Sequence, residues 1–233
     1  MLKPSAANLR VAGLVRMSTC DWPGQLAATI FCQGCAWDCV YCHNPNLQPM
    51  TSPDLIDWQS IADFLATRRR LLDAVVFTGG EATLQPALAA AMEEVRALGF
   101  KIGLHTAGMH PERFRAVLPL ADWVGYDVKA PFHLYERITG VPGSGERARA
   151  NLVHLLASGK DYEVRTTLHS GLLTLDEMLW LKEELLSLGV RNYAVQGFRK
   201  EGTRADRLSV LNNAPTYTLP NDFASGFESF VLR

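Results

Sequence analysis

The sequence predicts an α/β fold built from parallel strands, and three observations support this prediction. Six short apolar runs recur along the chain, each bounded by glycine or polar residues, as expected of strands covered on both faces. Amphipathic segments that suit helices lie between these runs. Such alternation implies right-handed crossovers and a parallel sheet, arranged either as an open doubly wound sheet or as a barrel.

The predicted elements follow one another in β-α order. The strands are expected at residues 26–31, 73–77, 100–104, 123–128, 162–168 and 192–195. The helices are expected at residues 58–65, 84–95, 148–157 and 174–189. Thr174 and Glu177 have the spacing of a capping box at the start of the last helix. Residues 131–145 are ambiguous, and residues 202–233 form a tail that the pattern does not assign.

Composition indicates one globular domain over residues 1–233, because 48% of the residues are hydrophobic and can form a sizeable core. The net charge of -1 gives no basic footprint for nucleic acid and no polybasic patch for a membrane. No run approaches the roughly 18 apolar residues that span a bilayer, and the first ten residues lack a signal-peptide core. We therefore expect a cytoplasmic protein.

Residues that could bind a ligand or take part in catalysis lie at the ends of the predicted strands. In chain order they are Cys35, then Gly79, Gly80 and Glu81, then His105 and Thr106, then Asp127 and Lys129, then Arg165, and finally Gln196. The carboxyl ends of parallel strands open onto one face of an α/β fold, and functional sites are built there. The sequence therefore predicts one site that draws on all six strands.

Five cysteines, at positions 20, 32, 35, 39 and 42, lie in the first fifth of the chain. This crowding indicates a metal or cluster site rather than a disulfide framework. Cys35, Cys39 and Cys42 can hold three irons of a [4Fe–4S] cluster from one loop and leave the fourth iron open. With Cys32 as a fourth ligand, a zinc site or an electron-transfer cluster is an alternative, and buried thiols are another. The spacing favours the open cluster.

The run Cys35-x-x-x-Cys39-x-x-Cys42, with Tyr41 before the last cysteine, resembles the signature of the radical S-adenosylmethionine (SAM) superfamily. This resemblance implies a partial (β/α)6 barrel of parallel strands with outer helices. It also implies one [4Fe–4S] cluster held by these three cysteines, with SAM on the open iron. Cys20 and Cys32 are not expected to be ligands, and Cys32 is expected to be a small buried residue.

The resemblance also implies which residues contact SAM. The run Gly79-Gly80-Glu81 is similar to the motif that meets the SAM amino group, although Ala82 replaces a frequent proline. The full set of expected SAM-contacting residues is Tyr41, Gly79, Gly80, Glu81, His105, Thr106, Asp127, Lys129, Arg165 and Gln196. Structural roles remain open for several of them: a strand-end turn around Glu81, a satisfied histidine at His105, an ion pair between Asp127 and Lys129, and a structural Arg165. Ala107 stands where relatives often have asparagine.

The resemblance covers roughly residues 13–199, and four segments point to one branch of the superfamily. Residues 15–24 resemble the start of glycyl-radical-enzyme activases, while residues 127–131, 165–167 and 196–199 resemble the anaerobic ribonucleoside-triphosphate reductase-activating branch. This implies that a reduced cluster cleaves SAM and that the 5′-deoxyadenosyl radical takes a Cα hydrogen from a glycine of the reductase. Five cysteines allow one cluster, so an external electron donor such as flavodoxin or ferredoxin is expected.

Two other functions remain open at this point. One is a radical SAM enzyme with a small-molecule substrate, similar to 7-carboxy-7-deazaguanine synthase. The other is a non-enzymatic zinc or electron-transfer module.

Overall fold

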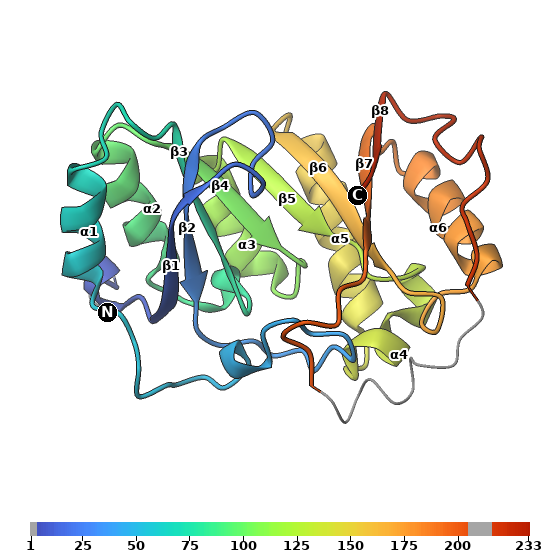
Figure 1. Ribbon diagram of the computed structural model, residues 1–233, viewed down its shortest axis with the longest axis horizontal. Coiled ribbons are helices and arrows are strands. Elements are labelled where there is room, and N and C mark those ends of the chain that lie inside the picture. The colour runs from blue at the N-terminus through green and yellow to red at the C-terminus, as the bar shows by residue number, and fades with distance from the viewer. Residues whose placement is uncertain (1–3, 205–215) are drawn as a thin grey trace. The chain divides into compact units, whose positions relative to one another are not determined.

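The computed structural model describes residues 4–204 and 216–233 and shows the predicted alternation of strands and helices (Figure 1). All six predicted strands are present: β2 (Ala27–Cys32), β3 (Ala74–Gly79), β4 (Lys101–Thr106), β5 (Trp123–Asp127), β6 (Asp161–Leu168) and β7 (Asn192–Gly197). The four predicted helices are α1 (Trp58–Ala66), α2 (Leu88–Ala97), α5 (Ser144–Ala157) and α6 (Leu175–Ser187). Helix α2 begins later than predicted, because Leu84 belongs to a preceding 3-10 turn.

The structure adds elements that the sequence pattern did not predict. They are β1 (Val11–Ser18), β8 (Ser229–Leu232), α3 (Pro111–Val117) and α4 (Tyr135–Thr139). Strand β1 pairs antiparallel with β2 and is the exception to the predicted parallel arrangement. Helix α4 lies within the ambiguous residues 131–145, and β8 lies within the unassigned tail. The tail residues 205–215 lie outside the described part of the chain.

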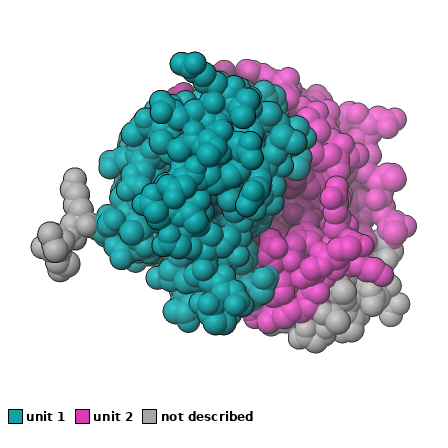
Figure 2. Space-filling view, turned by 60° about the vertical axis from the view of Figure 1, so that its left-hand side comes forward, with its two compact units in different colours: residues 1–36, 46–125 teal, residues 37–45, 126–233 magenta. Residues whose placement is uncertain are grey.

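The chain divides into two compact units, which Figure 2 shows in different colours. Unit 1 comprises Met1–Ala36 and Asn46–Gly125, and unit 2 comprises Trp37–Pro45 and Tyr126–Arg233. The division falls inside β5. The single domain over residues 1–233 stays a prediction.

In unit 1 the strands follow the order β1-β2-β3-β4, and β2, β3 and β4 are parallel. The register places Cys32 beside Gly79 and Phe77 beside Leu104. The carboxyl ends of these three strands therefore lie at one edge of the sheet, as the sequence predicted for parallel strands. The loops that carry Cys35 and Glu81 begin at this edge, and Thr106 ends β4 there.

A tryptophan pair lies in one buried cluster of unit 1. Trp22 and Trp123 stack with their ring centroids 5.4 Å apart, and they pack in one buried cluster with Ala27, Ala74 and Val76. Gly103 leaves space for this pair, because a Cβ atom there would lie 2.9 Å from Val76 and 3.0 Å from Trp22. The residues around Trp22 thus have a packing role.

Unit 2 contains the parallel strands β6, β7 and β8 in that order. The register places Leu168 beside Gly197, so the carboxyl ends of β6 and β7 also share an edge. The predicted capping box of α6 is confirmed, since Thr174 and Glu177 bond to each other's backbone amides. Among the residues that the structure describes, no helix has the length and apolar character needed to cross a membrane.

Candidate functional site

Cys35 lies in the loop after β2, and the chain that leads to it is fixed by a neighbouring segment of unit 1. The buried side-chain amide of Gln33 donates hydrogen bonds to the backbone carbonyls of Asn46 (3.1 Å) and Pro49 (2.6 Å). The amide of Cys35 donates to the carbonyl of Gln48 at 3.0 Å. The position of the Cys35 backbone is therefore set by residues more than ten positions further along the chain.

Gly79 and Gly80 end β3 in close contact with the chain that leads to Cys35. A Cβ atom at Gly79 would lie 2.3 Å from the backbone of Cys32, and one at Gly80 would lie 2.4 Å from the carbonyl of Gly34. Gly79 also has φ of +123°, which other residues rarely adopt. The structure thus gives both glycines a packing role, and their contact with SAM stays a prediction.

Glu81 is buried, at 2% exposure, and its carboxylate accepts hydrogen bonds from the loop after β4. The Thr106 hydroxyl donates at 2.7 Å and the Ala107 amide donates at 3.0 Å. Thr83 adds bonds from its hydroxyl (2.6 Å) and its amide (3.2 Å). The carboxylate therefore joins the ends of β3 and β4, which is the structural role that the sequence left open, and contact of Glu81 with SAM stays a prediction.

His105 also has a partner within unit 1. Its Nε2 lies 2.7 Å from the carbonyl oxygen of Asp21 and donates to it, and its ring meets Trp123 edge-on. This contact anchors the segment that carries Trp22. The structural role that the sequence left open for His105 is therefore present, and SAM binding by His105 stays a prediction.

Cys39 and Cys42 lie in unit 2, in the cluster loop, by which we mean residues 37–45. Cys39 is buried and Cys42 is half-buried, and the Cys42 amide donates to the Cys39 carbonyl at 3.1 Å. The amides of Asp38 and Val40 donate to the carbonyls at the end of α4, each at 3.0 Å. These bonds set the direction in which the Cys39 side chain leaves the backbone.

Lys129 brings a positive charge to the cluster loop. Its ammonium lies 5.4 Å from the centre of the Tyr41 ring and 4.0 Å from the Asp127 carboxylate, and its side chain is 13% exposed. Burial lowers the pKa of Lys129, but Tyr41, Cys39 and Asp127 outweigh burial and raise the pKa well above its usual value. Lys129 therefore stays charged at neutral pH.

Asp127 is shared between two cations. Arg165 donates to its Oδ1 at 3.2 Å, while Lys129 approaches its Oδ2. The amide of Val128 donates to the Arg165 carbonyl at 2.8 Å, which places the end of β5 beside β6. The ion pair that the sequence suggested for Asp127 and Lys129 is confirmed, and it includes Arg165. Gln196 pairs with Thr167 at the ends of β7 and β6 and is half-buried.

The cysteines differ in their surroundings. Burial and the nearby Glu81 raise the pKa of Cys32 to about 12, with Arg10 opposing the rise, so Cys32 is a neutral thiol. Its predicted burial is confirmed at 0% exposure. Burial also raises the pKa of Cys39, and Lys129 lowers it in part. Cys20 is exposed. Within residues 4–204 and 216–233, no three His, Cys, Asp or Glu side chains are grouped to hold a single metal ion.

The donor set fits an iron–sulfur cluster. Cysteine thiolates are the usual protein ligands of such clusters, and Cys35, Cys39 and Cys42 come from one short stretch of chain. The nearby Lys129 ammonium favours ionisation of Cys39, as ligation requires. Cys32 is held in β2 as a neutral thiol.

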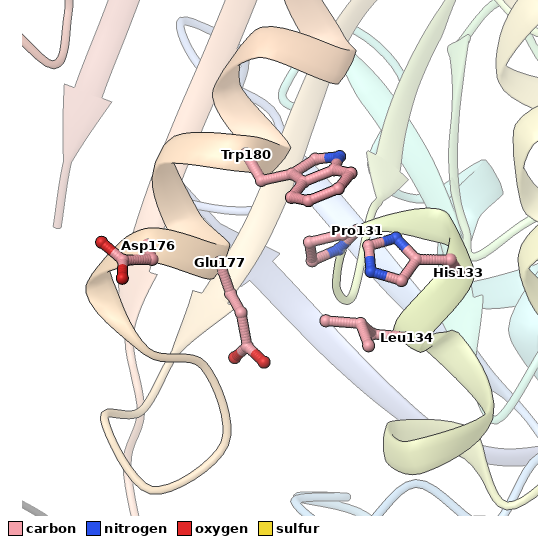
Figure 3. A pocket seen from close by; sticks show the side chains of 6 residues that line it. All are labelled: Pro131, His133, Leu134, Asp176, Glu177 and Trp180. Atoms are coloured by element: carbon pink, nitrogen blue, oxygen red, sulfur yellow. The ribbon is translucent and has the colours of Figure 1, made fainter.

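Two features of unit 2 were not found by sequence reasoning. The first is a set of contacts between the cluster loop and residues 198–204. No local sequence pattern predicts these contacts. The second is a pocket of about 210 Å³ between the residues after β5 and the start of α6 (Figure 3). Trp180 and His133 face each other in this pocket with ring centroids 4.9 Å apart. Its rim includes Glu177, which is paired with Arg137.

Comparison with protein families matches residues 29–180 to the radical SAM superfamily. Among curated relatives, a protein of Methanocaldococcus jannaschii named for glycyl-radical enzyme activation is 32% identical over 154 residues. The match covers 63% of this chain and 61% of the relative. The pyruvate formate-lyase-activating enzyme of Clostridium pasteurianum is 29% identical over 125 residues, covering 52% of each chain. The chain thus spans less than two thirds of the length of these two relatives.

A different activity is named in a shorter match. The 7-carboxy-7-deazaguanine synthase of Thermococcus kodakarensis is 44% identical over 59 residues, which are 25% of this chain and 23% of the relative.

Solved structures share the fold. QueE from Escherichia coli matches with a TM-score of 0.54 at 14% identity, covering 97% of this chain and 93% of that chain. Methylornithine synthase matches with a TM-score of 0.62 at 13% identity, covering 85% and 61%. Together with the family match, these likenesses confirm the predicted fold class, a partial (β/α)6 barrel of radical SAM type.

Proposed function

Because the chain belongs to the radical SAM superfamily, we propose that it is the activase of an anaerobic ribonucleoside-triphosphate reductase. Members of the superfamily use a [4Fe–4S] cluster and SAM, which together supply reductive cleavage of SAM and a 5′-deoxyadenosyl radical. In our proposal this radical takes a Cα hydrogen from a glycine of the reductase and leaves a glycyl radical there. The observation that supports an activase is the 32% identity to a relative named for glycyl-radical enzyme activation, and the choice of reductase rests on the resemblance of residues 127–131, 165–167 and 196–199.

Cys35, Cys39 and Cys42 hold the cluster in this proposal. Cys35 leaves a loop whose backbone is fixed by Gln48, and Cys39 leaves a loop fixed by the end of α4. We leave Cys32 out of the ligand set because its side chain is fully buried within β2. Cys20 is excluded because it precedes β2 on an exposed turn. The enzyme therefore has one cluster, and its electron comes from an external donor such as flavodoxin or ferredoxin.

The residues at the strand ends bind SAM in two different ways. Lys129 and Arg165 are cations close to Asp127, and such groups suit the carboxylate of a methionine moiety. Tyr41 presents its ring beneath the Lys129 ammonium and shields that charge from water. Gln196, at the end of β7, adds an amide that can donate or accept a hydrogen bond.

The remaining SAM-contacting residues act through the backbone. Gly79 and Gly80 lack side chains where the chain is crowded, so amides and carbonyls are the groups they can offer. Glu81 and Thr106 hold the two loops in one arrangement, and His105 anchors the segment before β2. We therefore assign Glu81, Thr106 and His105 the positioning of SAM-binding backbone.

The deciding experiment is electron paramagnetic resonance on the chain mixed anaerobically with the reductase, SAM and reduced flavodoxin. We expect the doublet of a glycyl radical, with consumption of SAM. Cys39→Ala should give neither, while Cys32→Ala should give both. A chain with a full cluster that cleaves SAM but yields no doublet would contradict the activase proposal.

A second candidate is a small-molecule enzyme similar to 7-carboxy-7-deazaguanine synthase, favoured by the 44% identity over 59 residues. Incubation with the substrate of that synthase, followed by mass spectrometry, distinguishes the two candidates. Formation of 7-carboxy-7-deazaguanine would replace the activase proposal. A zinc or electron-transfer module is disfavoured by the family match, and iron and sulfide analysis of anaerobically purified protein tests it directly.

A further inference from the structure

Residues 198–204, which we name the strap, follow β7 and lie against the cluster loop. Both segments belong to unit 2. The strap contacts the loop at two positions that flank Cys39 and Cys42: Asp38, just before Cys39, and His43, just after Cys42. A connection between two strands has no need of such contacts, because β7 and β8 already pair directly.

The first contact is an ion pair between Arg204 and Asp38. A guanidinium nitrogen of Arg204 lies 2.7 Å from Oδ1 of Asp38, and the two side chains are 35% and 50% exposed. An exposed pair of this kind contributes little energy by itself. Its importance lies in its position, because it holds the residue just before Cys39 against the end of the strap.

The second contact surrounds His43. Its Nε2 donates to the carbonyl of Arg199 at 2.6 Å, and its ring stacks on Phe198 with centroids 5.5 Å apart. Phe198 is itself fixed, since its amide donates to the Leu168 carbonyl at 3.0 Å and its ring meets His169 edge-on. The residue after Cys42 is thus tied to the end of β6 through the strap.

The third contact is backbone against backbone. Gly202 has φ of +84°, and a Cβ atom there would lie 2.5 Å from the His43 carbonyl oxygen. The turn around Gly202 is closed by Thr203, whose amide and hydroxyl both donate to the Lys200 carbonyl. This turn fits the loop only without a side chain at Gly202.

The cluster loop is also bonded to the end of α4. The amides of Asp38 and Val40 donate to the carbonyls of Thr139 and Ile138. Helix α4 and the strap therefore fix the same short loop through separate sets of contacts.

We propose that the strap is a clamp, which holds Cys39 and Cys42 in place and so slows the loss of iron from the cluster. The inference rests on the proposed function only through the presence of a cluster on these cysteines.

Two variants open the clamp by different means. Gly202→Ala inserts a Cβ atom against the His43 carbonyl, and Arg204→Glu places like charges at Asp38. The matched control is Gly159→Ala, because Gly159 also has a left-handed φ of +69°, but a Cβ atom there would meet no other part of the chain within 4 Å. The charge swap Asp38→Arg with Arg204→Glu restores an opposite-charge pair in reversed order.

The first measurement is the rate of iron release to a chelator from anaerobically reconstituted protein without SAM, followed by cluster absorbance. We expect Gly202→Ala to release iron about fivefold faster or more. Arg204→Glu should also release iron faster, by up to about fivefold, because the pair at Asp38 is exposed. Gly159→Ala and the charge swap should release iron at close to the original rate. Release at the original rate from both folded clamp variants would overturn the proposal.

The second measurement needs no cluster. Hydrogen exchange of the cluster-free protein should show faster exchange of the amides in residues 38–43 for Gly202→Ala than for Gly159→Ala. Equal exchange in the two variants would show that the strap does not hold the loop, and would overturn the clamp. If the original chain fails to bind any cluster, the proposed function fails, and the exchange experiment still decides whether the strap fixes the loop.

Discussion

The Thr106 hydroxyl donates a 2.7 Å hydrogen bond to the Glu81 carboxylate, and both residues are almost fully buried. This bond joins the loop after β3 to the last residue of β4. A buried carboxylate is costly unless it is well bonded, and Glu81 accepts further bonds from Thr83 and the Ala107 amide. Glu81 therefore supports the backbone of two loops at the edge where the parallel strands of unit 1 end.

Loss of this carboxylate should destabilise the protein before any ligand is added. Glu81→Ala leaves the buried donors of Thr83 and Thr106 without their acceptor, so we expect a loss of about 1.5–3 kcal/mol in the free energy of unfolding. Urea unfolding of the cluster-free protein measures this loss. Glu93→Ala is the control, because Glu93 is exposed on α2. Equal effects of the two substitutions would contradict a structural role for Glu81.

The same substitution should weaken SAM binding, because the loops that we propose to present backbone to SAM lose their connection. Equilibrium binding of SAM to the folded Glu81→Ala variant checks this expectation. The measurement is made without denaturant and at a temperature well below the unfolding transition of the variant. An affinity equal to that of the original chain would reject the role of Glu81 in SAM binding.

The three-ligand arrangement predicts different outcomes for neighbouring cysteines. Cys39→Ala should abolish SAM cleavage and lose most of the iron, while Cys32→Ala should keep a full cluster because Cys32 is a neutral buried thiol. Iron and sulfide analysis after anaerobic reconstitution provides the comparison. If Cys32→Ala loses iron as completely as Cys39→Ala, the cluster has a fourth cysteine ligand.

Lys129 should make the cluster easier to reduce. Its ammonium acts on Cys39, and a positive charge stabilises the reduced, more negative cluster more than the oxidised one. Lys129→Met should therefore shift the midpoint potential to more negative values, on the order of tens of millivolts. A spectroscopic redox titration measures the shift. The control is Lys182→Met. Lys182 lies on α6 beside Phe223, and loss of its charge should leave the midpoint potential unchanged.

Acid should weaken the contact between α4 and α6. The Arg137 guanidinium bonds to Glu177 through two nitrogens and lowers the pKa of that carboxyl. A lowered pKa in the folded state contributes stability that is fully present above the unfolded pKa of about 4.3 and is lost as pH falls through the folded value.

In Glu177→Gln the free energy of unfolding should therefore fall less steeply below about pH 4.3 than in the original chain. At neutral pH the variant should be less stable by about 0.5–1 kcal/mol, because this ion pair is partly exposed. Unfolding measured at several pH values tests this. Glu183→Gln, on the exposed side of the same helix, should keep the original pH dependence. A parallel change in both variants would contradict the assignment.

The fold was predictable where a local pattern was strong. Each of the six apolar runs became a strand, and the Thr174–Glu177 capping box marked the start of α6. Strand β1 escaped prediction because it is an edge strand with exposed Val15 and Met17 and no regular alternation. Strand β8 escaped because it has four residues, three of them exposed, and is held by its pairing with β7.

The sequence by itself predicted the donor set that we propose for the cluster. The spacing of Cys35, Cys39 and Cys42, and the glycines and glutamate after β3, are local features that can be read without any fold. Only the tertiary structure decided what several of these residues do: Glu81 joins two loops, Gly79 and Gly80 fit beside the chain that leads to Cys35, and Gly202 fits beside His43. These roles depend on contacts between residues from 25 to about 160 positions apart. The register of the strands and the path of the strap create such contacts, and no local pattern encodes them.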